Sequence, residues 1–226
     1  MCGRYSITTA PEALARLFGL SGPLTNLAPR YNLAPTQDAP VVRGDKDGTR
    51  RLTMLRWGLI PGWSKGPDAK YTMINARADT VASKPAYRTS FRERRCLVPA
   101  DGFYEWQVVG KAKQPMRIVR PDRGPFAMAG LWDRWDPRDG TAPVESFTIV
   151  TTEANARLRP IHDRMPVILA PDAWSAWLEW PAAEASALMR PAPDSWLEAY
   201  AVSTRVNSVK NDDPEVLLPL ESGRLV

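Results

Sequence analysis

Short runs of β-branched and aromatic residues recur along the chain, and clusters of glycine, proline or aspartate separate them. Such runs are typical of β-strands, and the turn residues between them indicate hairpins and antiparallel pairing. The predicted strands are Val41–Arg43, Leu52–Trp57, Cys96–Pro99, Phe103–Val109, Met116–Val119, Phe126–Trp132, Ser146–Thr151, Val167–Leu169 and Ala199–Ser203. We therefore expect a curved, barrel-like and mainly antiparallel β core.

Helical patterns are fewer and short. Pro11 suits a first helical position and Gly19 suits a helix end, with apolar residues at helical spacing between them. The segment Leu24–Gln37 is predicted to be a loop, because prolines and an asparagine interrupt it. The predicted helices are Pro11–Phe18, Pro85–Arg94, Pro171–Trp180 and Ala182–Met189. Together these elements predict one α+β domain over residues 1–226, with helices flanking the β core.

The composition is that of an ordinary soluble globular protein, with 44% hydrophobic and 24% charged residues. No apolar run approaches the ~18 residues of a membrane span, and the start of the chain lacks a signal-peptide pattern. The two cysteines, Cys2 and Cys96, form no disulfide framework, which favours a reducing, cytoplasmic location. A single histidine and no CxxC pair disfavour a zinc site, so we expect neither a metal nor an organic cofactor.

The formal net charge of +5 is a weak indication of an anionic partner. Basic residues concentrate between Lys84 and Arg95, where Glu93 is the one acidic residue, and a solvated helix face explains much of that cluster. Tryptophans at helical spacing from position 174 to 180 indicate the apolar side of a helix. Trp63 and Trp106 instead lie in loop-like or strand-end contexts, where they could stack on nucleic-acid bases.

Cys2 is the first residue with distinctive chemistry. Removal of Met1, which is usual before a small residue, would leave a first residue with an amine and a thiol on neighbouring carbons. An α-amine titrates near pH 8, so part of it is neutral and nucleophilic at pH 7. Such a pair can condense with an aldehyde to a Schiff base and then close a thiazolidine ring. The alternative is that Cys2 is an ordinary buried residue.

Two polar residues lie in otherwise apolar segments. Asn75 follows Met73 and Ile74, where an amide could orient a thiol or amine, although a turn-forming asparagine is the simpler interpretation. Glu105 lies between Tyr104 and Trp106, where loss of solvent would favour its neutral form and suit it to proton transfer. The alternative for Glu105 is a solvent-facing position on a strand, opposite Tyr104.

His162 is the only histidine, and it is followed by Asp163 and Arg164. Its unperturbed pKa near 6.5 suits a general acid or base, although a lone histidine is more often a surface or capping residue. Arg4, Arg77 and Arg164 each lie two residues from one of the polar candidates. This placement is expected if the reacting group belongs to a phosphodiester chain.

These residues belong to longer motifs that are specific as a set. The motifs are MCGRY (1–5), YNLAPTQ (31–37), RWGLIPGW (56–63), INARADT (74–80), RRCLVPADGFYEW (94–106) and IHDRMPVIL (161–169). In this order they resemble the SOS response-associated peptidase family, whose members shield abasic sites in single-stranded DNA. The resemblance runs from Cys2 to about Pro219 and is softer beyond about Asn207.

The resemblance implies a compact β-rich domain, a basic groove for single-stranded DNA, and a thiazolidine link between the N-terminal cysteine and the ring-opened abasic sugar. It implies no metal or cofactor, and in a bacterium a location at the nucleoid. The residues that match the family's active site are Cys2, Asn75, Glu105 and His162. Arg77, Trp106 and Arg164 match its DNA-contacting positions, and Asn32 and Trp63 fall in motifs that line its groove. Arg4 is a further candidate for a phosphate contact.

Two other activities fit parts of the pattern. A thiol peptidase would pair Cys2 with His162 and would remove Met1 itself. A non-catalytic single-strand binding module would use the arginines and tryptophans without covalent chemistry. A Schiff base at the abasic carbon would also acidify the neighbouring position, so some strand cleavage by β-elimination could accompany cross-linking.

Overall fold

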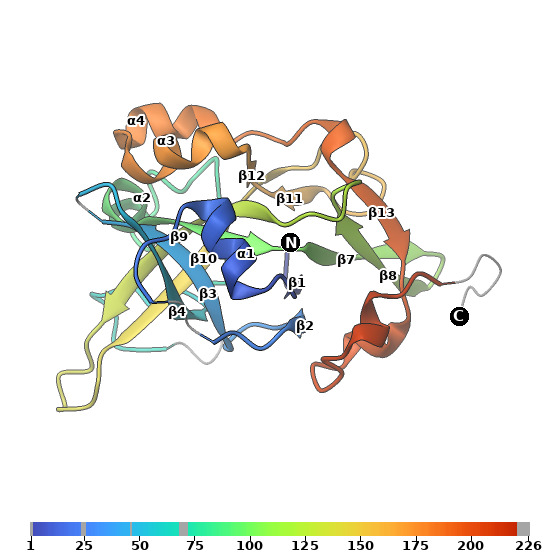
Figure 1. Cartoon of the computed structure of the whole chain (residues 1–226), viewed down its shortest axis with the longest axis horizontal. Coiled ribbons are helices and arrows are strands. Elements are labelled where there is room, and N and C mark those ends of the chain that lie inside the picture. The colour runs from blue at the N-terminus through green and yellow to red at the C-terminus, as the bar shows by residue number, and fades with distance from the viewer. Residues whose placement is uncertain (1, 24–25, 46, 68–71, 221–226) are drawn as a thin grey trace.

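Five strands of the larger sheet pair in a closed ring, and this barrel is the centre of the fold. The computed structural model describes residues 2–23, 26–45, 47–67 and 72–220 (Figure 1). The ring consists of β3 (Asp38–Gly44), β4 (Arg50–Trp57), β10 (Val144–Glu153), β9 (Phe126–Trp135) and β6 (Arg95–Ala100). Its pairs are antiparallel except β4 with β10. The expected barrel-like, mainly antiparallel core is confirmed.

Short strands extend the barrel along β10 and β9. The strand β5 (Asn75–Arg77) adds to β10 in parallel, and β11 (Arg164–Pro166) adds to β10 antiparallel. The strand β12 (Ile168–Leu169) pairs with β9. Residues 164–169 therefore add a short strand to each of two barrel strands, and β11 is held beside the end of β10.

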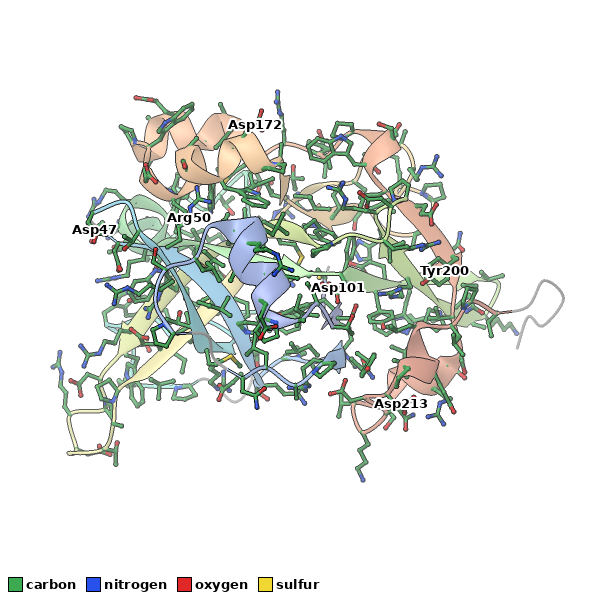
Figure 2. All side chains as sticks on the ribbon, viewed as in Figure 1. Asp47, Arg50, Asp101, Asp172, Tyr200 and Asp213 are labelled. Atoms are coloured by element: carbon green, nitrogen blue, oxygen red, sulfur yellow. The ribbon has the colours of Figure 1, made fainter. Side chains whose placement is uncertain are left out.

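A second, antiparallel sheet has the order β13 (Glu198–Ala201), β8 (Ala112–Val119), β7 (Gly102–Val109), β1 (Tyr5–Ile7) and β2 (Arg30–Leu33). Tyr5, Phe103 and Ile118 on one face belong to the main hydrophobic core. Tyr104 on the other face packs in a smaller cluster with Val202, Val206 and Val216. That face is covered by η4 (Thr204–Asn207) and η5 (Pro214–Leu217), and Figure 2 shows Tyr200 and Asp213 on this side of the molecule. Both faces of β7 are consequently buried from Gly102 to Glu105, whereas Val108 and Val109 at its end are exposed.

The helices cover the barrel and confirm two features of the sequence pattern. In α1 (Pro11–Phe18), Pro11 begins the helix and Gly19 ends it with a φ of 62°. Phe18 stacks on Trp174 of α3 (Trp174–Glu179), with ring centroids 4.4 Å apart. The remaining helices are α2 (Arg88–Glu93), α4 (Ala182–Ala185), η1 (Pro171–Ala173), η2 (Ser186–Leu188) and η3 (Asp194–Trp196); α3 and α4 lie together at the top of Figure 1.

The structure differs from the sequence predictions at three places. The segment predicted as a loop contains β2, whose backbone N–H groups at Tyr31 and Asn32 donate to the Asp212 carboxylate. The helix predicted from Pro85 begins only at Arg88. Trp180, expected with the buried tryptophans of α3, is exposed because the helix ends one residue before it.

Arg95 departs from the expected solvated face. It begins β6, is buried, and donates to the Phe91 carbonyl oxygen at 2.7 Å and to the carbonyl oxygens of Trp177 and Trp180. Arg92 is exposed, as a solvated face requires. Arg95 therefore joins the ends of α2 and α3. No helix within the described ranges is long and apolar enough to cross a membrane.

Candidate active site

Cys2 lies in the core at the entry to β1, and its side chain is fully buried. Its carbonyl oxygen accepts a hydrogen bond from Asn75 Nδ2 at 2.8 Å, and its Sγ lies 4.0 Å from the Arg4 carbonyl oxygen. Asn75 is fixed in turn, because β5 pairs with β10 opposite Ile149 and its carbonyl oxygen accepts from the Tyr87 hydroxyl at 3.2 Å. Asn75 thus lies where an amide orients the first residues of the chain. Met1 lies outside the described residues.

Glu105 on β7 is 4% exposed. The alternative of a solvent-facing Glu105 opposite a buried Tyr104 is wrong, because the barrel covers one face of β7 and the C-terminal segment covers the other. Burial raises the pKa of Glu105 to about 7. Burial also raises the pKa of the Cys2 thiol, and the charge of Glu105 raises it further. The charged form of the carboxyl therefore disfavours ionisation of the thiol.

His162 lies in the turn-rich loop before β11 and is half-buried. Its Nδ1 accepts from the Arg164 backbone N–H at 3.0 Å and lies 2.8 Å from Asp163 Oδ1. These partners favour opposite protonation states of Nδ1, but the Asp163 side chain is 85% exposed and solvent screens its charge. Burial lowers the pKa of His162, so the neutral imidazole with its proton on Nε2 is favoured.

Glu105 and His162 line one open cavity of about 520 Å³. Its other walls come from Trp106, Lys113 and Asn207. The indole Nε1 of Trp106 donates to Asn207 Oδ1 at 2.7 Å, which fixes the aromatic ring at the cavity edge. A buried acid, an imidazole, an aromatic surface and a cation thus converge on a single opening.

Two arginines lie on the two edges of β10. Arg164 on β11 donates from Nη2 to the Thr151 carbonyl oxygen at 2.6 Å, and its pKa is lowered by burial and then by the charge of Arg77. Arg77 on β5 pairs with Thr151 in the sheet, is exposed, and forms an ion pair with Asp79 at 2.5 Å. The charge of Arg77 acts on Arg164, so the two guanidinium groups lie near each other beside the site, where the charges of Asp79 and Asp163 also act on both.

Arg4 and Asn32 form a structural connection instead of a free surface. Arg4 Nη1 donates to Asn32 Oδ1 at 2.9 Å and to the Val206 carbonyl oxygen at 2.8 Å. The Arg4 guanidinium lies 5.9 Å from the centroid of the Trp106 ring. Asn32 is fully buried, and its Nδ2 donates to the carbonyl oxygens of Val206, Ser208 and Asn211. In this structure both polar atoms of the Asn32 side chain bind groups inside the protein, and its assignment to DNA binding stays a prediction.

Trp63 lies in an exposed position on another loop. Its side chain is 68% exposed, and the Gly62 N–H donates to Asp133 Oδ2 at 3.0 Å. Trp135 Nε1 donates to the Ser64 carbonyl oxygen at 2.9 Å, so the loop is tied to the end of β9 on both sides of Trp63. The structure fixes the loop but does not place Trp63 among the residues that line the 520 Å³ cavity.

The family model described as SOS response associated peptidase (SRAP) matches residues 1–209. The chain belongs to the SRAP family. The relative named abasic site processing protein YoaM, from Bacillus subtilis (strain 168), is 42% identical over 223 residues, which cover 96% of this chain and 97% of YoaM. The relative named abasic site processing protein HMCES, from Gallus gallus, is 38% identical, covering 86% of this chain and 67% of HMCES.

A solved structure of a protein from Bacteroides thetaiotaomicron has the same fold. It superposes with a TM-score of 0.88 and 28% sequence identity, covering 97% of this chain and all of that chain. This likeness, together with the closed ring of strands, confirms the α+β class of the SRAP fold expected from the motifs.

Three residues around the SRAP site were missed in the sequence. Lys113 and Asn207 line the cavity, and the Tyr87 hydroxyl supports Asn75. Lys113 comes from the strand paired with β7, and Asn207 from the C-terminal cover, so only tertiary structure brings them to Glu105. Asn207 carried the one usable signal, because it lies at the end of the matched residues.

Metal ligands do not gather in the part of the chain that the structure describes, where no group of three or more His, Cys, Asp or Glu side chains could hold an ion. The chemistry available to these residues is thus that of a thiol, a carboxyl poised near neutral pH and a neutral imidazole. Such a set can move protons during addition to a carbonyl carbon.

Proposed function

We propose that this SRAP protein binds single-stranded DNA with an abasic site and, after removal of Met1, joins Cys2 to the abasic sugar as a thiazolidine. The observation that carries the proposal is the burial of Cys2 beside Asn75 and Glu105, a carboxyl whose pKa is raised to about 7. The names of the relatives, abasic site processing proteins, support the substrate. We assign this function to one domain over residues 1–226.

The reaction begins with the closed hemiacetal of the abasic sugar. The His162 Nε2–H donates a hydrogen bond to the ring oxygen, and the proton lost from the anomeric hydroxyl passes to that oxygen as the ring opens to the aldehyde. The Cys2 amine adds to the aldehyde carbon, and loss of one water gives the Schiff base. The Cys2 sulfur then adds to the same carbon, and its proton passes to the ring nitrogen with Glu105 as the carrier. One water is released overall, and no oxidant or reductant is needed.

The raised pKa of the Cys2 thiol favours this order of steps. A thiol that remains protonated at neutral pH is a poor initial nucleophile, so the amine reacts first. Sulfur addition then becomes intramolecular, which greatly increases its effective concentration. The hydrogen bond from Asn75 to the Cys2 carbonyl oxygen holds the amine, thiol and aldehyde in register.

The DNA strand is held by charge and by stacking. Arg164 and Arg77 bind phosphates beside the lesion, and the buried Nε of Arg164 has no hydrogen-bond partner within the described residues. Trp106 stacks on a base at the cavity edge, a contact worth about 1–3 kcal/mol in comparable sites. Trp63 stacks farther along the strand, and Arg4 acts through Trp106 and the C-terminal cover.

The test is cross-linking on a denaturing gel. Protein purified with authentic Cys2 at its N-terminus is incubated with single-stranded DNA carrying one abasic site. We expect a shifted band that survives denaturation and is lost in Cys2→Ala. Cys2→Ser keeps the amine but weakens ring closure, so its adduct should be labile. A wild-type protein with a free Cys2 amine that gives no shifted band contradicts the proposal.

A thiol peptidase is the second candidate, and the description of the matched family favours it. The geometry supports it less well, because a peptidase needs a thiolate and burial raises the pKa of the Cys2 thiol. A peptidase would cleave peptides at a rate lost in Cys2→Ala without abasic DNA. A non-catalytic binding module would instead keep its DNA affinity in Cys2→Ala and form no adduct. In a bacterium, cytoplasmic or nucleoid-bound protein is expected under the main proposal.

A further inference from the structure

We infer that Gln107 is a positioning residue for His162, because it ties the tip of the histidine loop to the strand that carries Glu105. Gln107 Nε2 donates to the Pro160 carbonyl oxygen at 3.2 Å. Pro160 precedes His162 by two residues, so the bond acts close to the imidazole. The catalytic consequence rests on the proposed function, whereas the positioning itself can be measured without DNA.

The loop over residues 154–163 is a compact unit with an internal frame. The Ala154 N–H donates to the Asp163 carbonyl oxygen at 2.9 Å and closes the base of the loop. Within it, the N–H groups of Ile161 and His162 donate to the Leu158 carbonyl oxygen at 2.8 and 2.9 Å. The imidazole therefore moves with the loop backbone, and whatever fixes the loop fixes His162.

The far side of the loop is attached to the segment before η3. Asn155 Nδ2 donates to the Ala192 carbonyl oxygen at 3.0 Å, and Asn155 Oδ1 accepts from the Leu158 N–H at 3.0 Å. The Arg157 N–H donates to Asp194 Oδ1 at 3.2 Å. These contacts hold residues 155–158, and Pro160 and His162 follow them in the loop. An attachment on the side of the cavity would hold the turn that carries the imidazole.

Gln107 supplies that attachment from β7. Residues two apart on a strand point to the same side, so Gln107 and Glu105 both project toward the histidine loop. Because one strand carries Glu105 and binds the loop, the Gln107 bond sets the separation of the acid and the imidazole across the cavity. The bond is partly exposed and single, so its loss should loosen the loop tip without unfolding the barrel.

Several charged groups act on His162. The charge of the amino terminus lowers its pKa, Asp163 and Arg164 flank it in the chain, Glu105 lines the same cavity from β7, and Lys113 lines it from β8. Gln107→Met removes the donor at nearly constant size and leaves these charges in place. Gln107→Lys restores a donor that can reach the Pro160 carbonyl oxygen. The pair of variants therefore separates hydrogen bonding from side-chain volume.

The first measurement uses the single histidine of the chain, which gives one imidazole signal in NMR. Burial lowers the pKa of His162, so a loosened loop should expose the ring and raise that pKa toward its ordinary value in Gln107→Met. Gln107→Lys adds a positive charge that would itself lower the pKa of His162, so this variant is compared at high pH, where the imidazole is neutral. Its His162 signal should there keep the chemical shift of the wild type. An unchanged titration curve in Gln107→Met overturns the positioning role.

The second measurement is the rate constant of cross-linking at saturating abasic DNA, with DNA affinity measured separately on intact single strand. Gln107→Met should lower the rate constant about fivefold, the factor that one ordinary net hydrogen bond provides, and leave affinity unchanged. Gln107→Lys should return the rate constant to within about twofold of the wild type. A fall in affinity with no fall in rate would make Gln107 a DNA contact instead and would reject the inference. A wild type that does not cross-link rejects the proposed function alone, because the NMR result still decides the role of Gln107.

Discussion

Cys2 and Cys96 are both fully buried, and burial raises the pKa of both thiols, yet their surroundings differ in kind. Cys96 lies on β6, where a Cβ built on Gly130 would come within 2.8 Å of its sulfur and of a Val98 methyl carbon. Cys2 instead lies beside Asn75 and feels the charge of Glu105. Burial is therefore shared by Cys96 and by the thiol that we propose to react. What distinguishes Cys2 is a carboxyl within electrostatic range, Glu105, and an amide that binds its backbone, Asn75.

The largest expected effect separates the two cysteines directly. Cys2→Ala should abolish the cross-link, whereas Cys96→Ala should keep the cross-linking rate within about twofold and lower the free energy of unfolding by about 1–2 kcal/mol, because it empties a packed position. Gel cross-linking and denaturant unfolding of both variants provide the two readouts. A cross-link lost in a folded Cys96→Ala protein would break the comparison.

Glu105→Gln is expected to slow cross-linking about 100-fold, because it removes the proton carrier. In the wild type the rate should rise as pH increases through about 7, where Glu105 loses its proton and becomes a base. The variant should lack the inflection near pH 7 and keep only the rise that follows deprotonation of the Cys2 amine near pH 8, as shown by single-turnover rates between pH 5.5 and 8.5.

Glu198→Gln is the matched control, since Glu198 forms a surface ion pair with Arg123 far from Cys2 along the sheet order. It should change neither the rate nor its pH profile.

Because the pKa of Glu105 is higher in the folded than in the unfolded chain, its ionisation lowers stability as pH rises toward about 7, and the full cost is present above that pH. Glu105→Gln should therefore be at least as stable as the wild type at pH 8. A Glu105→Gln protein that cross-links slowly but is less stable than the wild type at pH 8 would contradict the role of Glu105 as the proton carrier.

Gly130→Ala tests how tightly Cys96 is packed. The new methyl group would meet the Cys96 sulfur and a Val98 methyl carbon at 2.8 Å, so we expect a loss of about 1–3 kcal/mol of stability from overpacking. In Cys96→Ala the sulfur is absent, and the added cost of Gly130→Ala should be smaller. A double-mutant cycle by urea unfolding measures this coupling, and full additivity would show that the two side chains do not share the space.

The smallest expected effect is on the binding of DNA by residues near the Cys2 site. Arg77 and Arg92 are both exposed and each pairs with an acidic residue nearby in sequence, but Arg77 lies beside the site and Arg92 on α2. Arg77→Ala should reduce the salt dependence of single-strand binding by about 0.7 in the logarithmic slope, the contribution of one phosphate contact. Arg92→Ala should leave that slope unchanged in fluorescence anisotropy titrations. Equal slopes in the two variants would remove Arg77 from the DNA path.

The sequence predicted those parts of the molecule whose cause is local. The strands β3, β4 and β6 to β10 follow from residue pattern, the helix α1 follows from Pro11 and Gly19, and these elements lie close to their expected positions. The strand β2 was missed because its stabilisation comes from Asp212, far along the chain. The solvent-facing alternative for Glu105 failed for a similar reason, since strand alternation cannot show that a second layer covers both faces of β7.

The candidate site was likewise predictable from the sequence only in part. Motifs selected Cys2, Asn75, Glu105 and His162, and the structure shows the contact of Cys2 with Asn75 and the shared cavity of Glu105 and His162. The same motifs could not show that Asn32 holds the C-terminal cover segment, because both polar atoms of its side chain bind groups that only the tertiary structure brings near.

The most direct test of the central claim is the intact mass of the protein–DNA adduct, followed by treatment with borohydride and peptide mapping. The account predicts a mass equal to the chain without Met1 plus the DNA strand minus one water, resistance to reduction, and a link at Cys2. Resistance is expected because a closed thiazolidine has no carbon–nitrogen double bond to reduce. An adduct that gains two hydrogens, that maps to a lysine or to Cys96, or that retains Met1 would contradict the account.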